Sequence, residues 1–228
     1  MKNLKSMIAI FLLALAFPAV AGAQAGAGGL GGVLGRSPLP RGVFNPVVGS
    51  GAQYEIQPAN GQNKMTIEID VVGKESAGGK EGYWLETAFD SQMGQMMMKM
   101  LMVSDGANST IAKMIMQMRA GQPMEMPAQM IGHAAQQTFD IRDKADKVGS
   151  ESVTTPAGTF MADHYHMKDG SGDFWVSEKI SPYGVIKGQG KDGNIVLTKV
   201  VTDAKDKITG TPVPFNPAAL LQGIQTSR

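Results

Sequence analysis

The chain of 228 residues contains no cysteine. That absence excludes disulfide bridges, thiolate metal sites, cysteine nucleophiles and lipid attachment through an N-terminal cysteine. An excess of charge of one sign is also missing, because 21 lysine and arginine residues balance 20 aspartate and glutamate residues. A near-neutral chain has no broad attraction for phosphate backbones or anionic lipid surfaces, which excludes a strongly basic nucleic-acid-binding protein.

Motifs for common catalytic chemistry are missing as well. The sequence has neither a G-x-S-x-G nucleophile elbow nor a phosphate-binding P-loop. The acidic turn at Asp169 is not an EF-hand, because its twelfth position is Ile180 rather than glutamate. Single carboxylates such as Glu86 and Glu125 suit acid–base work only where burial shifts their pKa. We therefore expect no enzyme and no cofactor.

The N-terminal segment has the form of a secretory signal peptide. Lys2 and Lys5 supply a short positive region, and an apolar run over residues 7–20 follows. Small residues then form two A-x-A cleavage patterns that end at Ala23 and Ala25. The run is shorter than the ~20 residues of a membrane span. The sequence therefore predicts an exported, periplasmic protein of a Gram-negative envelope, with residues 1–25 removed and no transmembrane span in the mature chain.

Composition divides the remaining chain into three parts. Residues 26–51 are rich in glycine and proline and have no sustained period, which predicts a flexible arm. Residues 52–210 alternate between short apolar segments and polar turns, which predicts a single domain. Residues 211–228 form a tail in which Asn216 and Pro217 are residue types that begin a short helix.

The central part has the pattern of a mainly β fold with a few short helices. About ten segments of period two predict one curved antiparallel sheet, and so large a twisted sheet curls toward a half-barrel. One mid-chain helix is predicted over Ala128–Thr138. The predicted strands are Gln53–Gln57, Met65–Val71, Tyr83–Asp90, Met96–Val103, Ile111–Arg119, Lys147–Val153, Thr159–Met167, Phe174–Val176, Val185–Lys187 and Ile195–Val201.

Methionine is concentrated between Met93 and Met130, which hold 12 of the 17 methionines. Many of them alternate along two predicted strands, and period-two residues share one face of a strand. If the two strands pair through a turn at Asp105-Gly106, seven thioethers lie on one side of one hairpin. The other side is expected to be partly wet, because it carries Lys99, Lys113, Gln117 and Arg119. Its remaining residues are Met97, Leu101 and Val103 opposite Ile111 and Ile115. The seven residues are Met96, Met98, Met100, Met102, Met114, Met116 and Met118.

Three interpretations of the methionine rows compete. The rows are a core face, or a pliable apolar cavity for lipids or acyl chains, or a soft-metal site, because thioethers select Cu(I). A possible metal alternative is His164 with His166 and Met167, since the two imidazoles share a strand face. No third ligand is evident from spacing, and His133 is the only other histidine.

Three motifs in the C-terminal half resemble those of a known family. They are Thr155-Pro156-Ala157-Gly158-Thr159-Phe160, Asp173-Phe174-Trp175-Val176-Ser177 and Pro182-Tyr183-Gly184-Val185-Ile186-Lys187. Their order resembles uncharacterised bacterial envelope domains that are similar to the outer-membrane lipoprotein carrier (LolA/LolB-like) superfamily. The resemblance implies a curved antiparallel half-barrel with short helices over its concave side. In the carrier itself, that hollow holds lipoprotein acyl chains. The shared motifs are structural, so no binding residue carries over.

The sequence thus predicts a non-enzymatic periplasmic binder or carrier of a hydrophobic ligand, a lipid or an acyl chain, with the seven methionines lining the concave site. One alternative is a periplasmic protein that binds Cu(I) or Ag(I) through methionine and histidine. Another is a structural module that makes peripheral contacts in the envelope through its arm or its C-terminal helix. No nucleic-acid partner is expected.

Overall fold

The computed structural model describes residues 42–59, 61, 63–91, 94–105, 108–118, 121–128, 131 and 140–216. All of these belong to one unit, Pro38–Arg228. The predicted signal peptide, most of the predicted arm and the helix predicted after Asn216 lie outside the described residues, as does most of the helix predicted over Ala128–Thr138.

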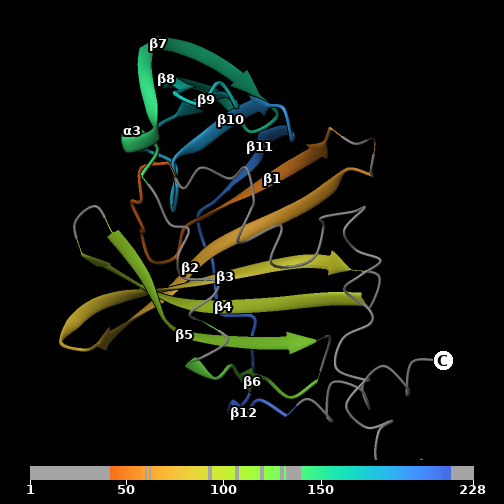
Figure 1. The fold of residues 1–228 in the computed structure, drawn as a ribbon. Coiled ribbons are helices and arrows are strands. Elements are labelled where there is room, and N and C mark those ends of the chain that lie inside the picture. Colours follow the sequence, from red (N-terminus) through yellow and green to blue (C-terminus); the bar gives the residue numbers. More distant parts are fainter. Residues whose placement is uncertain are drawn as a thin grey trace, which may run out of the picture. The chain divides into compact units, whose positions relative to one another are not determined.

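Twelve strands form one sheet in the order β12-β6-β5-β4-β3-β2-β1-β11-β10-β9-β8-β7 (Figure 1). The first group of strands is β1 (Gly51–Pro58), β2 (Met65–Ala77), β3 (Lys80–Ser91), β4 (Gly94–Asp105), β5 (Asn108–Met118) and β6 (Met124–Glu125). The second group is β7 (Ala145–Thr155), β8 (Gly158–Met167), β9 (Gly172–Val176), β10 (Val185–Gly190), β11 (Gly193–Val201) and β12 (Val213–Pro214). A four-residue helix, α3 (Ile141–Lys144), precedes β7. The predicted mainly β, curved antiparallel half-barrel is confirmed.

The topology is two meanders joined side by side. β1 to β6 follow one another across the sheet, β7 to β11 do the same, and antiparallel pairing of β1 with β11 joins the two groups. A feature that the sequence did not predict is the short parallel pair of β12 with β6 at one edge. The strands that matter most for the site, β2 to β6, therefore come from one continuous part of the chain.

Tight turns set the register of this part of the sheet. Ala77 pairs with Lys80, so Gly78 and Gly79 alone make the turn between β2 and β3. Their φ angles are 59° and 78°, a left-handed conformation that glycine adopts without steric penalty. β2 is longer than the predicted Met65–Val71, because a bulge between Val71 and Gly73 lets its polar end continue to pair with β3.

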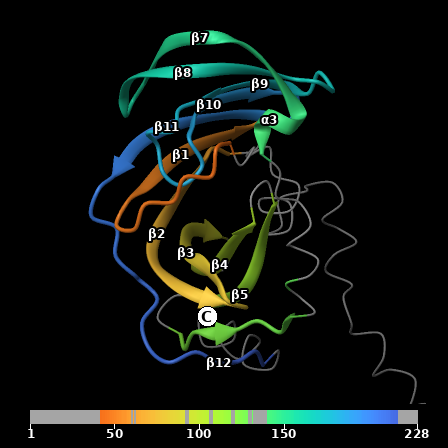
Figure 2. The same cartoon turned by 90° about the vertical axis from the view of Figure 1, so that its left-hand side faces the viewer.

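The sheet curves, so it has a concave and a convex side (Figure 2). Ile67, Ile69 and Val71 alternate along β2 and are buried on the concave side. The same side of the other group of strands carries a hydrophobic cluster closed by Ile141 of α3. The other members of that cluster are Ala145, Tyr165, Met167, Phe174 and Val176.

Residues 202–212, which we call the strap, run from β11 to β12 along the convex side (Figure 2). The sequence predicted that this side of the methionine hairpin would be partly wet. Instead, Gln117 is 4% exposed and donates to the carbonyl of Gly121, while Lys99 forms an ion pair with Asp206 of the strap. The prediction was wrong for Gln117, which is buried and bonded to a loop residue only four positions along the chain. Lys99 and Lys113 are half-buried, and Arg119 lies outside the described residues.

The last residues of the predicted arm make specific contacts. Phe44 packs edge-on against Tyr83, with ring centroids 6.4 Å apart, and lies 5.8 Å from the ring of Tyr183. The amide of Gly49 donates to the carbonyl of Val71. Residues 42–50 are therefore docked on the sheet immediately before β1 begins.

Candidate functional site

The two methionine rows lie on one face of the β4–β5 hairpin. Met96 is directly opposite Met118, Met98 is opposite Met116, and Met100 is opposite Met114. Residues that are directly opposite in an antiparallel pair project to the same side, with Cβ atoms about 5 Å apart. The pairing predicted from the alternation is confirmed. That these side chains bind a ligand stays a prediction.

Met102, the last methionine of the β4 row, has a different partner from the one that simple alternation predicts. A bulge between Leu101 and Met102 places Ile111 directly opposite Met102, so Ala112 is the extra residue. Ile111 was predicted on the other side of the hairpin, and that prediction was wrong. The bulge therefore places an aliphatic side chain, Ile111, at the end of the methionine rows. Both Met102 and Ile111 are buried.

Burial of the rows is uneven. The four methionines of the β4 row are 0–3% exposed and Met114 of β5 is 7% exposed, whereas Met116 and Met118 are only half-buried. The thioethers of the β4 row are thus part of the interior, whereas those at the end of β5 are partly exposed.

The apolar surface extends beyond the residues predicted from the sequence. Met124 of β6 lies directly opposite Met116, so the line Met98–Met116–Met124 crosses three strands. On the same face, along the opposite edge of β4, Leu85 and Thr87 of β3 lie directly opposite Met100 and Met98. We call the eight methionines of β4, β5 and β6 on this side the methionine face. They are Met96, Met98, Met100, Met102, Met114, Met116, Met118 and Met124.

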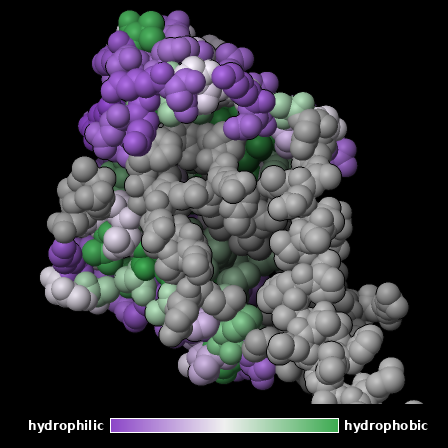
Figure 3. Space-filling view, viewed as in Figure 1, coloured by the Kyte–Doolittle hydropathy of each residue, from purple (hydrophilic) through white to green (hydrophobic). Residues whose placement is uncertain are grey.

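Met124 was not predicted to belong to this surface. It lies in a two-residue strand between Pro123 and Pro127, where periodicity has no length over which to show. In the space-filling view, hydrophilic residues gather over β7 and β8, whereas apolar residues are visible around β6 (Figure 3).

A buried hydroxyl lies on the same concave side. Tyr54 of β1 is 1% exposed and is directly opposite Ile67 of β2 and Leu197 of β11. Among the described residues its hydroxyl has no hydrogen-bond partner. Burial, and to a smaller extent the nearby Tyr183, raises the pKa of Tyr54, so the phenol is neutral.

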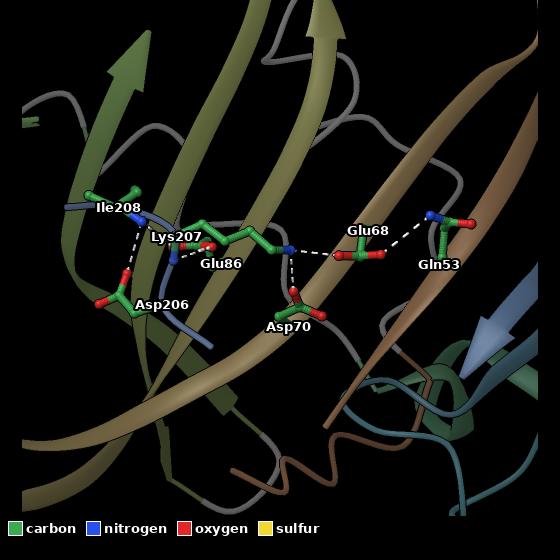
Figure 4. A network of polar contacts seen from close by, with 7 residues as sticks. All are labelled: Gln53, Glu68, Asp70, Glu86, Asp206, Lys207 and Ile208. Atoms are coloured by element: carbon green, nitrogen blue, oxygen red, sulfur yellow. Dashed lines mark hydrogen bonds and ion pairs between the residues drawn. The ribbon is translucent and has the colours of Figure 1, made fainter. Parts of the chain in front are cut away.

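The convex side of the same strands is polar. Glu86 of β3 lies directly opposite Asp70 of β2 and Lys99 of β4. Glu86 accepts hydrogen bonds from the backbone amides of Lys207 and Ile208 in the strap, at 3.1 Å (Figure 4). Burial, with a contribution from Asp206, raises the pKa of Glu86 to about 7. Glu125, the other carboxylate singled out in the sequence, is exposed.

The histidine pair lies far from the methionine face, on β8. His164 Nε2 and His166 Nδ1 lie 2.9 Å and 3.0 Å from the same oxygen of Asp173. The ring of His164 also stacks on Trp175, with centroids 4.4 Å apart. Met167 projects to the opposite side, into the hydrophobic cluster around Phe174. The alternative metal site therefore does not bring its three residues together.

Two other features of the described residues bear on function. No group of three or more histidine, cysteine, aspartate or glutamate side chains among them has an arrangement that suits a metal ion. His133 lies outside the described residues. Within the described ranges, no helix is long and apolar enough to cross a membrane.

Comparison with known proteins gives weak likenesses only. No protein-family model matches the chain, and no curated protein matches it. A crystal structure described as that of a lipoprotein from Parabacteroides distasonis ATCC 8503 is 12% identical, with a TM-score of 0.35 over 69% of this chain and 97% of that one. A protein from Bacteroides fragilis NCTC 9343, described as exported and with a YmcC-like fold, is 15% identical, with the same TM-score and coverage.

The crystal structure of MucB is 11% identical, with a TM-score of 0.42 over 75% of this chain and 60% of that one. At such identities and TM-scores, these likenesses assign neither a family nor a function to the chain. The resemblance to the lipoprotein carrier superfamily stays a prediction from sequence motifs.

Proposed function

We propose that this protein is a non-enzymatic binder or carrier of a hydrophobic ligand, a lipid or an acyl chain, in the bacterial envelope. The observation that carries the proposal is the ladder of directly opposed methionines, extended by Met124, on the concave side of the sheet. The half-buried thioethers of Met116 and Met118 are the expected points of first contact.

The chemistry of methionine supports a ligand surface rather than a core alone. Its side chain is unbranched and flexible, so it specifies one rigid packing poorly and re-packs easily around varied shapes. Neighbouring strands use branched residues for the same side of the sheet, such as Ile67, Ile69 and Leu85. The change from branched to thioether side chains at β4 marks the region that is built to adapt.

The energy available from such a surface is of the same order as the cost of association. Burial of acyl methylenes yields about 0.8 kcal/mol each. Ten methylenes thus supply about 8 kcal/mol before the translational and ordering losses of association are subtracted. This estimate counts only the apolar chain of the ligand, because the methionine face is apolar.

The proposal is non-enzymatic because of the surroundings of Glu86. A carboxylate with a pKa of about 7 is a candidate for acid–base catalysis. Glu86 is, however, 1% exposed and its oxygens accept from the strap amides, so this carboxylate has a structural role. The proposed envelope location rests on the N-terminal charge, apolar run and cleavage pattern of residues 1–25.

A second candidate function, binding of Cu(I) or Ag(I), is favoured by one specific observation. Three directly opposed methionine pairs bring thioether side chains to the same side of one hairpin, and thioethers select Cu(I). The site of this candidate is the methionine face, since the histidine pair lies on another strand and the other side of the sheet. The two candidates differ in what Met→Leu substitutions change, because leucine keeps the apolar area and removes the sulfur.

The proposal is tested by titration of the purified protein with a fluorescent fatty acid, together with organic extraction of protein purified from an envelope fraction. We expect saturable binding of the probe and recovery of co-purified lipid in the extract. Absence of both saturable binding and extractable lipid would overturn the proposal.

A further inference from the structure

The strap crosses the convex side of β2, β3 and β4 before it reaches β12 (Figures 2 and 4). Its attachment is made by few residues. Lys207 Nζ donates to Glu68 Oε1 at 2.6 Å and to Asp70 Oδ2 at 2.7 Å. The amides of Lys207 and Ile208 donate to Glu86, and Lys99 Nζ lies 2.5 Å from Asp206 Oδ2. The strap is thus held mainly by charged groups and backbone amides, together with one buried aliphatic side chain, Ile208.

The charges around Glu86 do not balance. β2 contributes Glu68 and Asp70, and the strap contributes Asp206, so four carboxylates including Glu86 gather at this place. Among the described residues, Lys207 and Lys99 face them, and Lys199 of β11 acts on Glu68, so three lysines stand against four carboxylates. The remaining charged groups nearby have other partners, since Lys113 of β5 pairs with Glu75 and Lys205 of the strap pairs with Asp203. A full set of ionised carboxylates therefore leaves excess negative charge under the strap.

The positions of Glu86 and Asp70 make this excess negative charge destabilising. They are directly opposite on neighbouring strands, and each is 1% exposed. Like charges that are directly opposite in a sheet destabilise it, and burial strengthens the effect. Asp70 Oδ1 has no hydrogen-bond partner among the described residues, so Lys207 alone compensates its charge.

The edge of the sheet that the strap holds is itself weakly attached. β12 pairs with β6 over two residues, and β6 pairs with β5 over two residues. The amides of Val213 and Phe215 donate to Pro123 and Glu125. This edge carries Met124, which lies directly opposite the half-buried Met116 of the methionine face.

We propose that the strap is a proton-sensitive latch: it closes the β6–β12 edge beside the methionine face when Glu86 is protonated, and it releases that edge when Glu86 ionises. The charge change occurs on the convex side, and its effect reaches the concave side because the strap continues directly into β12. The part of the proposal that concerns access to a ligand rests on the proposed function. The latch itself does not.

The sign follows from the environment of each group. Burial, then Asp206, raises the pKa of Glu86 to about 7, although the strap amides act in the opposite direction. Burial also raises the pKa of Asp70, despite Lys207. Since opening exposes Glu86 and returns its pKa toward 4.5, protonation favours the closed latch. Burial opposes ionisation of Glu68, but Lys207 outweighs burial and lowers the pKa of Glu68. The ion pair between Glu68 and Lys207 is therefore lost only at acid pH.

Hydrogen–deuterium exchange of the ligand-free full chain tests the latch. Exchange of segments 203–216 and 123–126 is measured at pH 5.5, 7 and 8, with rates corrected for the intrinsic pH dependence of amide exchange. From the pKa of about 7 we expect the opening equilibrium of these segments to rise roughly tenfold to thirtyfold between pH 5.5 and pH 8. Protection of β8 and β9 is expected to stay unchanged.

Variants separate the latch from a general loss of stability. In Glu86→Gln, which imitates the protonated acid, we expect the pH dependence to disappear and the latch to stay closed at pH 8. Lys207→Met is expected to open the latch at every pH, whereas the matched control Lys205→Met, on the same strap but in an exposed pair, behaves as the wild type. Asp206→Asn moves the opening to lower pH and serves if Glu86→Gln does not fold.

The outcomes distinguish the latch from the proposed function. Corrected exchange that does not change with pH, or the same pH dependence in Glu86→Gln as in the wild type, overturns the latch. If exchange responds as expected while a fluorescent fatty acid fails to bind at pH 5.5 and at pH 8, the proposed function fails and the latch stands. Faster binding and release of the probe at pH 8 than at pH 5.5 supports both.

Discussion

Met98 of β4 and Met116 of β5 lie directly opposite each other on the concave side of the sheet, one fully buried and the other half-buried. The flexible thioether side chains of this pair thus extend from the interior of the protein to its surface. The neighbouring strands β2 and β3 carry a charged network on the convex side of the sheet, under the strap (Figure 4). This part of the sheet thus has an apolar, adaptable side and a charged side.

Polar substitution at the surface end of the methionine face should weaken ligand binding. In the double variant Met116→Gln and Met118→Gln, we expect the affinity for a fluorescent fatty acid to fall about tenfold, because polar amides replace apolar contact area. The matched control is Met161→Gln, since Met161 is 65% exposed on β8. Equal affinities of both variants would show that the ligand does not use this face.

Leucine substitution separates the two candidate functions. In the triple variant Met114→Leu, Met116→Leu and Met118→Leu, we expect fatty-acid affinity to stay within about threefold of the wild type, because the apolar area is nearly conserved. A Cu(I) competition titration of the same variant is the second measurement. Tight Cu(I) binding by the wild type that is lost in this variant, with fatty-acid binding absent from both, would favour the metal-binding function instead.

Removal of the unpartnered hydroxyl of Tyr54 should not destabilise the protein. A buried hydroxyl without a hydrogen bond is unfavourable, so we expect Tyr54→Phe to raise the free energy of unfolding by about 1 kcal/mol, as measured by urea denaturation. A decrease by more than about 1 kcal/mol would instead mean that the hydroxyl has a favourable partner in solution.

Global stability should fall as the pH rises through neutrality. Because the pKa of Glu86 is raised from 4.5 to about 7, its contribution is fully present below pH 4.5 and is lost as the pH passes 7. Between pH 5 and pH 8 we expect the free energy of unfolding to decrease by about 2 kcal/mol. The lowered pKa of Glu68 acts in the opposite sense, since its stabilisation is present above pH 4.5 and is lost in acid.

Urea denaturation of the wild type and of Glu86→Gln over this pH range measures the effect of Glu86. The variant should show a flatter profile, with the difference between the two proteins greatest at pH 8. Parallel profiles would assign the pH dependence to other groups.

Much of the sheet was predictable because its strands show clean alternation. Met65–Val71 and Met96–Val103 have period-two patterns that remain visible in a single sequence, and the register of the methionine hairpin followed from them. The bulge at Met102 was not predictable, because the extra residue, Ala112, fits either phase of the alternation.

The strap was beyond local reasoning for a different reason. Residues 202–212 have no period and no turn motif that indicates what they cover. Glu86 therefore read as one of many single carboxylates, and its burial depends on Lys207 and Ile208, more than a hundred residues away in sequence. Only the folded arrangement shows that the polar side of β2–β4 is enclosed.

Native mass spectrometry of the protein purified from its own envelope, with no ligand added, tests the central claim most directly. We predict a bound species whose added mass is that of a lipid or fatty acid, and we predict that this species is depleted in the Met116→Gln and Met118→Gln variant but not in Met161→Gln. A bare polypeptide mass, or an adduct that persists unchanged in the double variant, would contradict the assignment of the methionine face as the binding site.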